Sequence, residues 1–362
     1  MLRVLHLVGS PTSEFLAELS RLYARDALDA VADPGRYEFS VAHVSPDGCW
    51  RFPTAGGAAP GGSALDGDVL AATPALDVGD AVARLRELAP DVVVPQMFCL
   101  PGMTSYRALF DVLGVPIVGN AADVMAVGAD KPRARAIVAH GGVDVPAGVV
   151  VHPGEAPPDL ELPVVVKPAD SDNSLGVTLV RRPGELRPAL AAAYEHARSA
   201  LVETYVPAGR EVRCGVIERD RPGGPDVDGS RTELVCLPLE EYPLDAGTAP
   251  IRTPADKLAR DDDGGLGLVA KGDGKAWPVD VDDPVTAAVW AAARRCYVAL
   301  GCRDYGLFDF RVDPDGRPWF LEAGLYCSFA RTSVVVMMAA QGGVPLADLF
   351  AEMVTRAARR RA

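Results

Sequence analysis

The chain has 362 residues, 49% of them hydrophobic, which is enough for more than one packed core and excludes disorder of the whole chain. Its formal net charge of −13 argues against non-specific binding to nucleic acid or to anionic membranes, so an anionic ligand would need a local group of lysines, arginines and metal ions. The sequence shows no signal peptide or membrane span, so we predict a cytoplasmic protein. Its seven cysteines form no CxxC pair, which favours structural thiols over disulfides or a zinc site.

Strands and helices alternate over the first 125 residues. The hydrophobic pattern predicts strands at 2–8, 37–44, 91–94 and 115–119, and helices at 13–31, 78–88 and 104–113. Residues 54–67 are rich in glycine, alanine and proline and predict a loop. Such alternation is typical of a parallel sheet covered by helices, so we predict an N-terminal α/β domain over residues 1–125.

Two α+β units are predicted after residue 125. The first, residues 126–205, combines helices at 131–140 and 185–199 with strands at 147–151, 164–166, 177–180 and 200–206. The second, residues 206–362, combines antiparallel strands within 211–236, helices at 284–300 and 344–361, and a late hairpin. The polar, glycine- and aspartate-rich segment 245–283 predicts a mobile loop over a site.

The late hairpin carries the most informative pattern. Its two apolar runs flank the turn 313–316, and each run holds one carboxylate, Asp309 in the first and Glu322 in the second. Strand pairing brings both acids onto adjacent strands, where they repel each other unless a cation lies between them. Carboxylate oxygens suit Mg²⁺, so the hairpin predicts a magnesium site, although two surface acids on an edge hairpin would give the same pattern.

Two lysines lie where an anion would be bound. Lys167 ends an apolar strand, and burial would require an anionic partner, whereas a solvated strand end would not. Lys131 opens a predicted helix, whose N-terminus also attracts anions, although lysines on exposed helix termini are common.

Other polar residues form weaker patterns. The loop 170–176 contains small polar residues and a glycine, which let backbone N–H groups approach phosphate oxygens, although an ordinary hairpin loop looks the same. Glu203 and Glu211 flank an extended segment that could bind a planar base and its ribose, and Lys257 adds a cation from the segment 245–283. The sequence has no P-loop, no Rossmann fingerprint, no GxSxG and no HExxH, and its five histidines show no ligand spacing.

Taken in chain order, these motifs resemble those of the ATP-grasp ligases of the D-alanine–D-alanine ligase type, over residues 2 to about 335. The resemblance implies an ATP-grasp fold with an N-terminal α/β pre-ATP-grasp domain, ATP and Mg²⁺ as cofactors, small-molecule substrates and a homodimer. It implies that two carboxylates bind the metal: Asp309 and Glu322. It implies that the following residues bind the nucleotide: Lys131, Lys167, Ser171, Asn173, Ser174, Gly176, Glu203, Tyr205, Val206, Glu211 and Lys257.

The resemblance also implies catalytic and substrate-binding residues. Lys167 and Lys257 are expected to stabilise the transferring phosphate, and Arg311 is a candidate for the same role because the family's arginine two residues before the metal aspartate is Leu307 here. A neutral residue at position 167 is expected to lower turnover by orders of magnitude while leaving the fold largely intact. The predicted substrate contacts are Glu14, Gln96, Met97, Ser328 and Ser333.

Two departures from the D-alanine ligases change the expected substrate. Gly324 stands where those enzymes have a third metal ligand, and the run 96–103 replaces their donor-site signature. The runs 95–104, 167–176, 209–215, 237–242 and 320–329 are similar to those of the mycosporine-like amino acid ligases. That likeness implies the joining of an amino acid, serine or threonine above all, to mycosporine-glycine through a phosphorylated intermediate.

Three alternatives stay open at this point. A D-alanine–D-alanine ligase or another dipeptide ligase would form an acyl phosphate instead. A kinase or synthetase outside the ATP-grasp class would have to reproduce the ordered motifs by chance. A non-catalytic nucleotide-binding protein is the third, because Gly324 removes one ligand.

Overall fold

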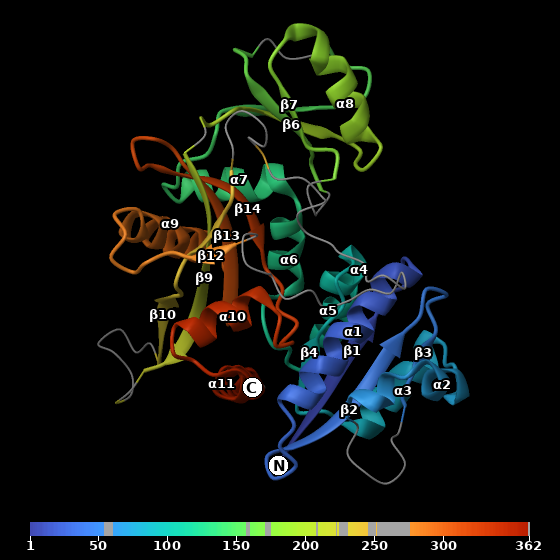
Figure 1. Ribbon diagram of the computed structural model, residues 1–362. Helices are drawn as coiled ribbons and strands as arrows, with labels where there is room; N and C mark the ends of the chain where they lie inside the picture. Colours follow the sequence, from blue (N-terminus) through green and yellow to red (C-terminus); the bar gives the residue numbers. More distant parts are fainter. Residues whose placement is uncertain are drawn as a thin grey trace.

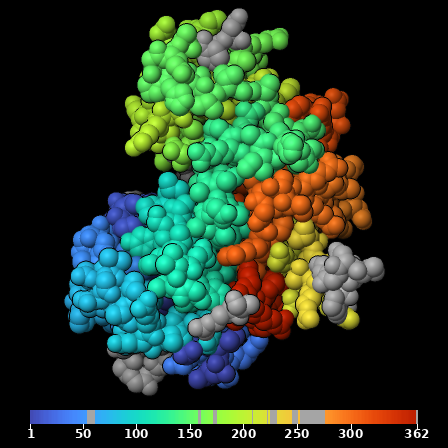
Figure 2. Space-filling view, turned by 180° about the vertical axis from the view of Figure 1, so that it is seen from behind, coloured from blue at the N-terminus to red at the C-terminus, as the bar shows by residue number. Residues whose placement is uncertain are grey.

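The protein is described here by a computed structural model that covers residues 1–53, 61–156, 160–170, 175–207, 209–221, 223, 231–244, 251 and 276–360. Three sheets follow one another along this part of the chain, with helices on their faces (Figure 1). Seen from behind, the lobe around the second sheet stands above the rest of the molecule (Figure 2). The structure confirms the predicted order, an α/β sheet followed by two antiparallel α+β units.

The first sheet has the order β3-β2-β1-β4, with β1 parallel to both β2 and β4. Its strands are β1 (Leu2–Gly9), β2 (Tyr37–Val44), β3 (Trp50–Arg51) and β4 (Val92–Pro95). Alternate residues of β1 enter two cores: Val4 and Val8 pack with α1 and α11, and Leu5 and Leu7 pack with α3 and α5. The helices around this sheet are α1 (Glu14–Ala30), α2 (Gly67–Ala72), α3 (Val78–Leu88), α4 (Leu100–Met103) and α5 (Ser105–Val112).

The predicted strand at 115–119 is reduced to a single parallel bridge between Val93 and Ile117. Only the backbone groups on either side of Ile117 bond to Val93, and Gly119 then turns the chain away with a φ of +84°. The helix that follows, α6 (Ala122–Ala129), is missing from the sequence prediction. It leads through Asp130, whose side chain caps the next helix, into α7 (Lys131–His140).

The second sheet has the order β5-β8-β6-β7 and is antiparallel throughout. Its strands are β5 (Gly148–Val151), β6 (Val164–Pro168), β7 (Thr178–Val180) and β8 (Ala200–Thr204), and α8 (Leu186–Tyr194) covers one face. The register places Lys167, near the end of β6, opposite Leu201 of β8. Lys167 thus lies near the C-terminal end of an inner strand, where its Nζ approaches β14 of the third sheet.

The third sheet has the order β12-β11-β9-β13-β14, with β10 also paired to β9. Its strands are β9 (Arg210–Asp220), β10 (Thr232–Cys236), β11 (Glu240–Tyr242), β12 (Trp277–Pro278), β13 (Tyr305–Val312) and β14 (Pro318–Gly324), and its helices are α9 (Thr286–Ala299), α10 (Val334–Gln341) and α11 (Leu346–Arg359). The predicted hairpin is β13–β14, and Asp309 lies directly opposite Glu322. Just beyond this pair the register shifts by one residue at a β-bulge that contains Leu321.

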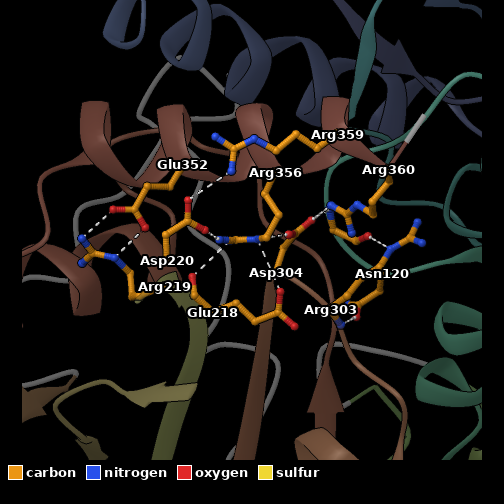
Figure 3. Close-up of polar contacts among 11 residues, drawn as sticks. Asn120, Glu218, Arg219, Asp220, Arg303, Asp304, Glu352, Arg356, Arg359 and Arg360 are labelled. Carbon is orange, nitrogen blue, oxygen red and sulfur yellow. Dashed lines mark hydrogen bonds and ion pairs between the residues drawn. The ribbon is translucent and has the colours of Figure 1, made fainter. Parts of the chain in front are cut away.

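A buried ionic cluster joins the first and last parts of the chain (Figure 3). Asp304 is fully buried and accepts hydrogen bonds from Arg356 and Arg360 of the C-terminal segment, and from the backbone N–H of Gly119. Asn120 bonds to the backbone of Tyr305 and of the segment that follows β14. These contacts hold the C-terminal helix, the third sheet and the end of the first α/β unit in one arrangement.

No single helix in the described part of the chain is long and apolar enough to cross a membrane, and α10 and α11 meet that criterion only as a pair bent by 113°. The predicted domain boundaries near residues 125 and 205 fall between the sheets and stay a prediction.

Candidate nucleotide and metal site

A cleft of about 780 Å³ lies between the second and third sheets. Eight polar or charged residues line it: Lys131, Lys167, Glu203, Thr204, Glu211, Asp309, Arg311 and Glu322. The rest of the lining is mostly apolar: Pro146, Val165, Pro168, Leu175, Val177, Tyr205, Val206, Ile251 and Leu321. The sequence segments that supply them extend from Lys131 to Glu322. The fold therefore gathers in one cleft most of the residues for which the motifs predict nucleotide or metal binding.

Lys167 lies in the cleft as half of a buried ion pair. Its Nζ is 2.6 Å from Oε1 of Glu203, and the two side chains are only 8% and 5% exposed. The same Nζ lies 3.5 Å from the backbone oxygen of Leu321, the residue in the β-bulge of β14. Lys167 is thus held in place by one contact from its own sheet and one from the sheet across the cleft, and it is not the solvated strand end that the sequence left open.

Four charged residues form a row on one face of the third sheet, and the two on β13 and β14 line the cleft. Glu240, Arg213, Asp309 and Glu322 are successive register partners on β11, β9, β13 and β14, so their side chains share one face of the sheet. Arg213 binds Asp309 through both nitrogens of its fork, with Nη2 2.6 Å from Oδ2. Glu322 lies 4.0 Å from Nζ of Lys131, at the start of α7.

The Asp309–Glu322 pair has the chemistry of a magnesium site. Its donors are hard carboxylate oxygens on facing strands, and Mg²⁺ in nucleotide sites is typically held by one or two carboxylates, with phosphate oxygens and water as the other ligands. Among the described residues no group of three or more His, Cys, Asp or Glu could hold a metal. The Asp309 carboxylate, an acceptor of about four hydrogen bonds, still has lone pairs beyond those used by Arg213.

A second ion pair in the cleft is formed by Glu211 and Arg311. These are register partners on β9 and β13, both are buried, and Nη2 of Arg311 lies 2.9 Å from Oε2 of Glu211. The guanidinium of Arg311 also lies over the ring of Tyr205, 5.7 Å from its centroid. Arg311 is thus two residues from Asp309 on the same face of β13, with its guanidinium bonded to Glu211, and its role as a replacement for the cation missing at Leu307 stays a prediction.

Several predicted residues lie outside the described part of the chain or outside the cleft. Ser171, Asn173, Ser174 and Lys257 are not among the described residues. Gly176 adopts a φ of +69° between two residues that line the cleft, Leu175 and Val177.

The five predicted substrate-binding residues do not line the nucleotide cleft. Glu14 begins α1 and is exposed, with Arg21 3.0 Å away. Gln96 and Met97 are buried, and the Gln96 amide is held between His6 and the backbone oxygen of Ser328. Ser328 is itself buried, and Ser333 precedes α10 half-buried. The structure thus gives Gln96 an internal partner on each side, and these substrate contacts stay predictions.

Sequence reasoning missed Arg213. Burial would lower the pKa of its guanidinium, but the charge and hydrogen bonds of Asp309 outweigh burial and hold that pKa above its ordinary value, so Arg213 is a cation. A signal was present in the sequence: Arg213 follows the predicted ribose acid Glu211 by two residues, so strand periodicity places both on one face.

Comparison with known proteins identifies the family. The family model described as "D-ala D-ala ligase C-terminus" matches residues 154–229 and 273–355. The D-alanine–D-alanine ligase of Mycolicibacterium vanbaalenii is 30% identical over 353 residues, covering 91% of this chain and 90% of that protein, and the one from Nocardia farcinica is 31% identical over 354 residues with the same coverage.

Solved structures share the fold. The VanG D-Ala:D-Ser ligase from Enterococcus faecalis superimposes with a TM-score of 0.73 at 20% identity, with 98% of each chain covered. The D-alanine–D-alanine ligase from Bacillus anthracis complexed with ATP gives a TM-score of 0.67 at 17% identity, covering 99% of this chain and 98% of that one. With its ATP-grasp fold and full-length relatives, the chain belongs to the D-alanine–D-alanine ligase family of ATP-dependent, ADP-forming carbon–nitrogen ligases.

Proposed function

We propose that the protein joins the amine of an amino acid to a second small molecule that it first phosphorylates with ATP. The observation that carries this proposal is the convergence of Lys131, Lys167, Asp309 and Glu322 in one cleft that also holds Glu211. A nucleotide that lies along the cleft would place its triphosphate among the lysines and the carboxylate pair, and its ribose beside Glu211. The base would lie against Tyr205 and Val206.

In this mechanism the protein positions the reactants and neutralises charge. Lys167 and Lys131 would bind phosphate oxygens, and Asp309 and Glu322 would hold Mg²⁺, which would neutralise the charge that develops on the phosphates. Donor oxygen attacks the γ-phosphorus and ADP leaves. The amine then adds to the activated carbon, phosphate departs and the nitrogen loses a proton, so each cycle forms one carbon–nitrogen bond and releases ADP and phosphate.

The comparisons favour an amino acid as the phosphorylated substrate. The relatives at about 30% identity are named D-alanine–D-alanine ligases, and the VanG structure is named a D-Ala:D-Ser ligase. A dipeptide ligase that forms an acyl phosphate is therefore the first candidate.

A second candidate rests on residues that differ from the D-alanine ligase pattern. Position 307 is a leucine, position 324 is a glycine, and the run 96–103 is changed, as in the mycosporine-like amino acid ligases. In this reaction the ring carbonyl oxygen of mycosporine-glycine takes the γ-phosphate, and the amine of serine or threonine replaces it as an imine.

One assay separates the candidates. The protein is incubated with ATP, MgCl₂ and either D-alanine alone, D-alanine with D-serine, or mycosporine-glycine with serine or threonine, while ADP release and ultraviolet absorption are followed. ADP release with D-alanine supports the dipeptide ligase, and ADP release with a red shift in absorption supports the second candidate. Absence of ADP with every pair would contradict the proposal and favour a nucleotide-binding protein without turnover.

The remaining expectations belong to the same proposal. A cytoplasmic location, a homodimer and the three units 1–125, 126–205 and 206–362 stay predictions, which size-exclusion chromatography with light scattering and limited proteolysis would test.

A further inference from the structure

The charged row on the third sheet contains a cation that none of the motifs assigns. The row reads Glu240, Arg213, Asp309, Glu322 across four strands, with Lys131 approaching its far end. Arg213 bonds to both oxygens of the Asp309 carboxylate, one of the two predicted metal ligands. Its side chain is 13% exposed and does not line the cleft, so it acts on a ligand through Asp309.

The row on one side of this charged row carries no charge. Leu307 lies two residues before Asp309, and its register partners are Gly215 and Gly324. The row on the other side holds Arg311, the arginine of β13, but its guanidinium is paired with Glu211. Within the described residues, the positive charge nearest to Asp309 on this sheet therefore comes from β9.

Resting on the metal site of the proposed function, we propose that Arg213 is a positioning residue that sets the divalent-cation affinity of the Asp309–Glu322 pair. Its fork fixes the orientation of the Asp309 carboxylate and offsets one of the two negative charges that face each other across β13 and β14. The pair then binds a metal ion that arrives with the nucleotide, and does so more weakly than two unneutralised carboxylates would. Moderate affinity allows the ion to leave with the product.

Arg213 also has a counter-charge of its own. Glu240 is its register partner on β11, and the ring of Tyr242 lies under the guanidinium, 5.3 Å from its carbon to the ring centroid. The Tyr242 hydroxyl donates to Glu240, which keeps that carboxylate in place. Glu240 therefore moderates the charge that Arg213 exerts on Asp309.

The test measures Mn²⁺ binding in the presence of a non-hydrolysable ATP analogue, with the electron paramagnetic resonance signal of free Mn²⁺ as the readout. Arg213→Gln removes the charge and is expected to tighten Mn²⁺ binding about tenfold, because a unit charge near a divalent ion changes its binding by about that factor. Arg213→Lys keeps the charge and is expected to stay within about twofold of the parent protein. A residue with a merely structural role would weaken binding in both variants.

Arg219→Gln is the matched control. Arg219 lies on the same strand and forms the same kind of fork, with Nε and Nη2 2.7 and 2.6 Å from the carboxylate of Glu352, but it lies outside the cleft. Its loss should leave Mn²⁺ affinity unchanged. If Arg213→Gln fails to fold, Glu240→Gln is tested instead. In that variant Arg213 acts on Asp309 without a counter-charge, so we expect Mn²⁺ binding to be about threefold weaker.

Unchanged or weaker Mn²⁺ binding by folded Arg213→Gln, or unchanged binding by Glu240→Gln, would overturn the inference while leaving the proposed function standing. Failure of the parent protein to bind Mn²⁺ with the analogue would overturn the metal site and the inference together.

Discussion

Lys167 and Glu203 form a buried ion pair, with 2.6 Å between Nζ and Oε1, at the edge of the cleft where two sheets meet. Two charges that are removed from water stabilise a fold little in total, but the removal of one partner leaves the other buried and uncompensated. A change at Lys167, which is predicted to bind phosphate, is therefore expected to affect the stability of the second sheet as well.

Lys167→Met is expected to lower kcat by on the order of 10²–10³-fold, the usual cost of losing one preorganised donor to a developing charge. It is also expected to lower the free energy of unfolding by about 3–5 kcal/mol, because Glu203 loses its partner. The sequence alone predicts an intact fold for such a variant, since the buried partner cannot be seen there. Urea denaturation and steady-state kinetics measure the two effects.

The double variant Lys167→Met with Glu203→Gln is the control for this prediction. It removes both charges, so most of the lost stability should return while activity stays low. A single variant as stable as the parent protein would contradict the buried pair.

Glu211→Gln tests the nucleotide end of the cleft. If the Glu211 carboxylate accepts from ribose hydroxyls, its loss should raise the Kd for ATP by about tenfold, in the range of one hydrogen bond to a charged group, and should change the Kd for 2′,3′-dideoxy-ATP little. Isothermal titration calorimetry with both nucleotides measures the difference. Glu241→Gln, which alters a carboxylate paired with Arg210 on the neighbouring strand, should affect neither. An equal rise in Kd for ATP and for 2′,3′-dideoxy-ATP would mean that Glu211 does not bind the ribose hydroxyls.

Asp304→Asn tests the ionic cluster of Figure 3. Asp304 is fully buried and has a φ of +63°, a conformation that asparagine tolerates, so this change removes the charge without adding backbone strain. Because Arg356 and Arg360 both lose a charged partner, we expect unfolding to become easier by about 3–5 kcal/mol.

The matched control for this cluster is Asp220→Asn. Asp220 also pairs with Arg356, at 3.0 Å, but its side chain is 43% exposed, so its pair should contribute less than about 1 kcal/mol. Thermal denaturation of both variants gives the comparison. Equal losses of stability would show that burial does not determine how much Asp304 stabilises the fold.

Stability should fall in mild acid because of His6. Burial lowers the pKa of this imidazole to about 4, against about 6.5 in the unfolded chain, and the hydrogen bond to Gln96 opposes the shift only in part. Above pH 6.5 the residue is neutral in both states, and as the pH falls towards 4 the unfolded state binds the proton first. From pH 7.5 to 5.0 His6 alone should lower the free energy of unfolding by about 2 kcal/mol.

His6→Gln should reduce this pH dependence by that amount, whatever its effect on stability at pH 7.5. His152→Gln, which changes an exposed imidazole, should leave the pH dependence as it is. Urea denaturation at the two pH values measures both, and an unaltered pH dependence in His6→Gln would mean that folding does not shift the pKa of His6.

The sequence was sufficient for those parts of the site that depend on local pattern. The turn 313–316 is enough to predict the hairpin that brings Asp309 and Glu322 onto adjacent strands, but the bulge at Leu321, which places the two residues directly opposite each other, was not predicted. Strand periodicity likewise places Arg311 on the same face as Asp309. Local pattern could not predict that Arg311 pairs with Glu211, because this pairing depends on the register between β13 and β9, a strand about 100 residues earlier in the chain.

Helices α6 and α10 were missed for a compositional reason. Their sequences, 122–129 and 334–341, are apolar with little helical periodicity, and the second begins with three consecutive valines, which favour a strand. Each is helical because it packs against other parts of the chain, α6 against β14 and α10 against α11. The internal partners of Gln96 were hidden for the same reason, since one of them lies 232 residues away.

The bulge at Leu321 makes the hairpin sensitive to length rather than to residue identity. The contact that Lys167 receives there comes from a main-chain oxygen, so exchange of the leucine side chain leaves the acceptor in place. Deletion of Leu321 would remove the bulge and leave Glu322 opposite Asp309 in regular register, but it would withdraw the main-chain oxygen that Lys167 contacts. Loop grafts that keep the number of residues in this arm should thus keep that contact of Lys167, and grafts that are one residue shorter should lose it.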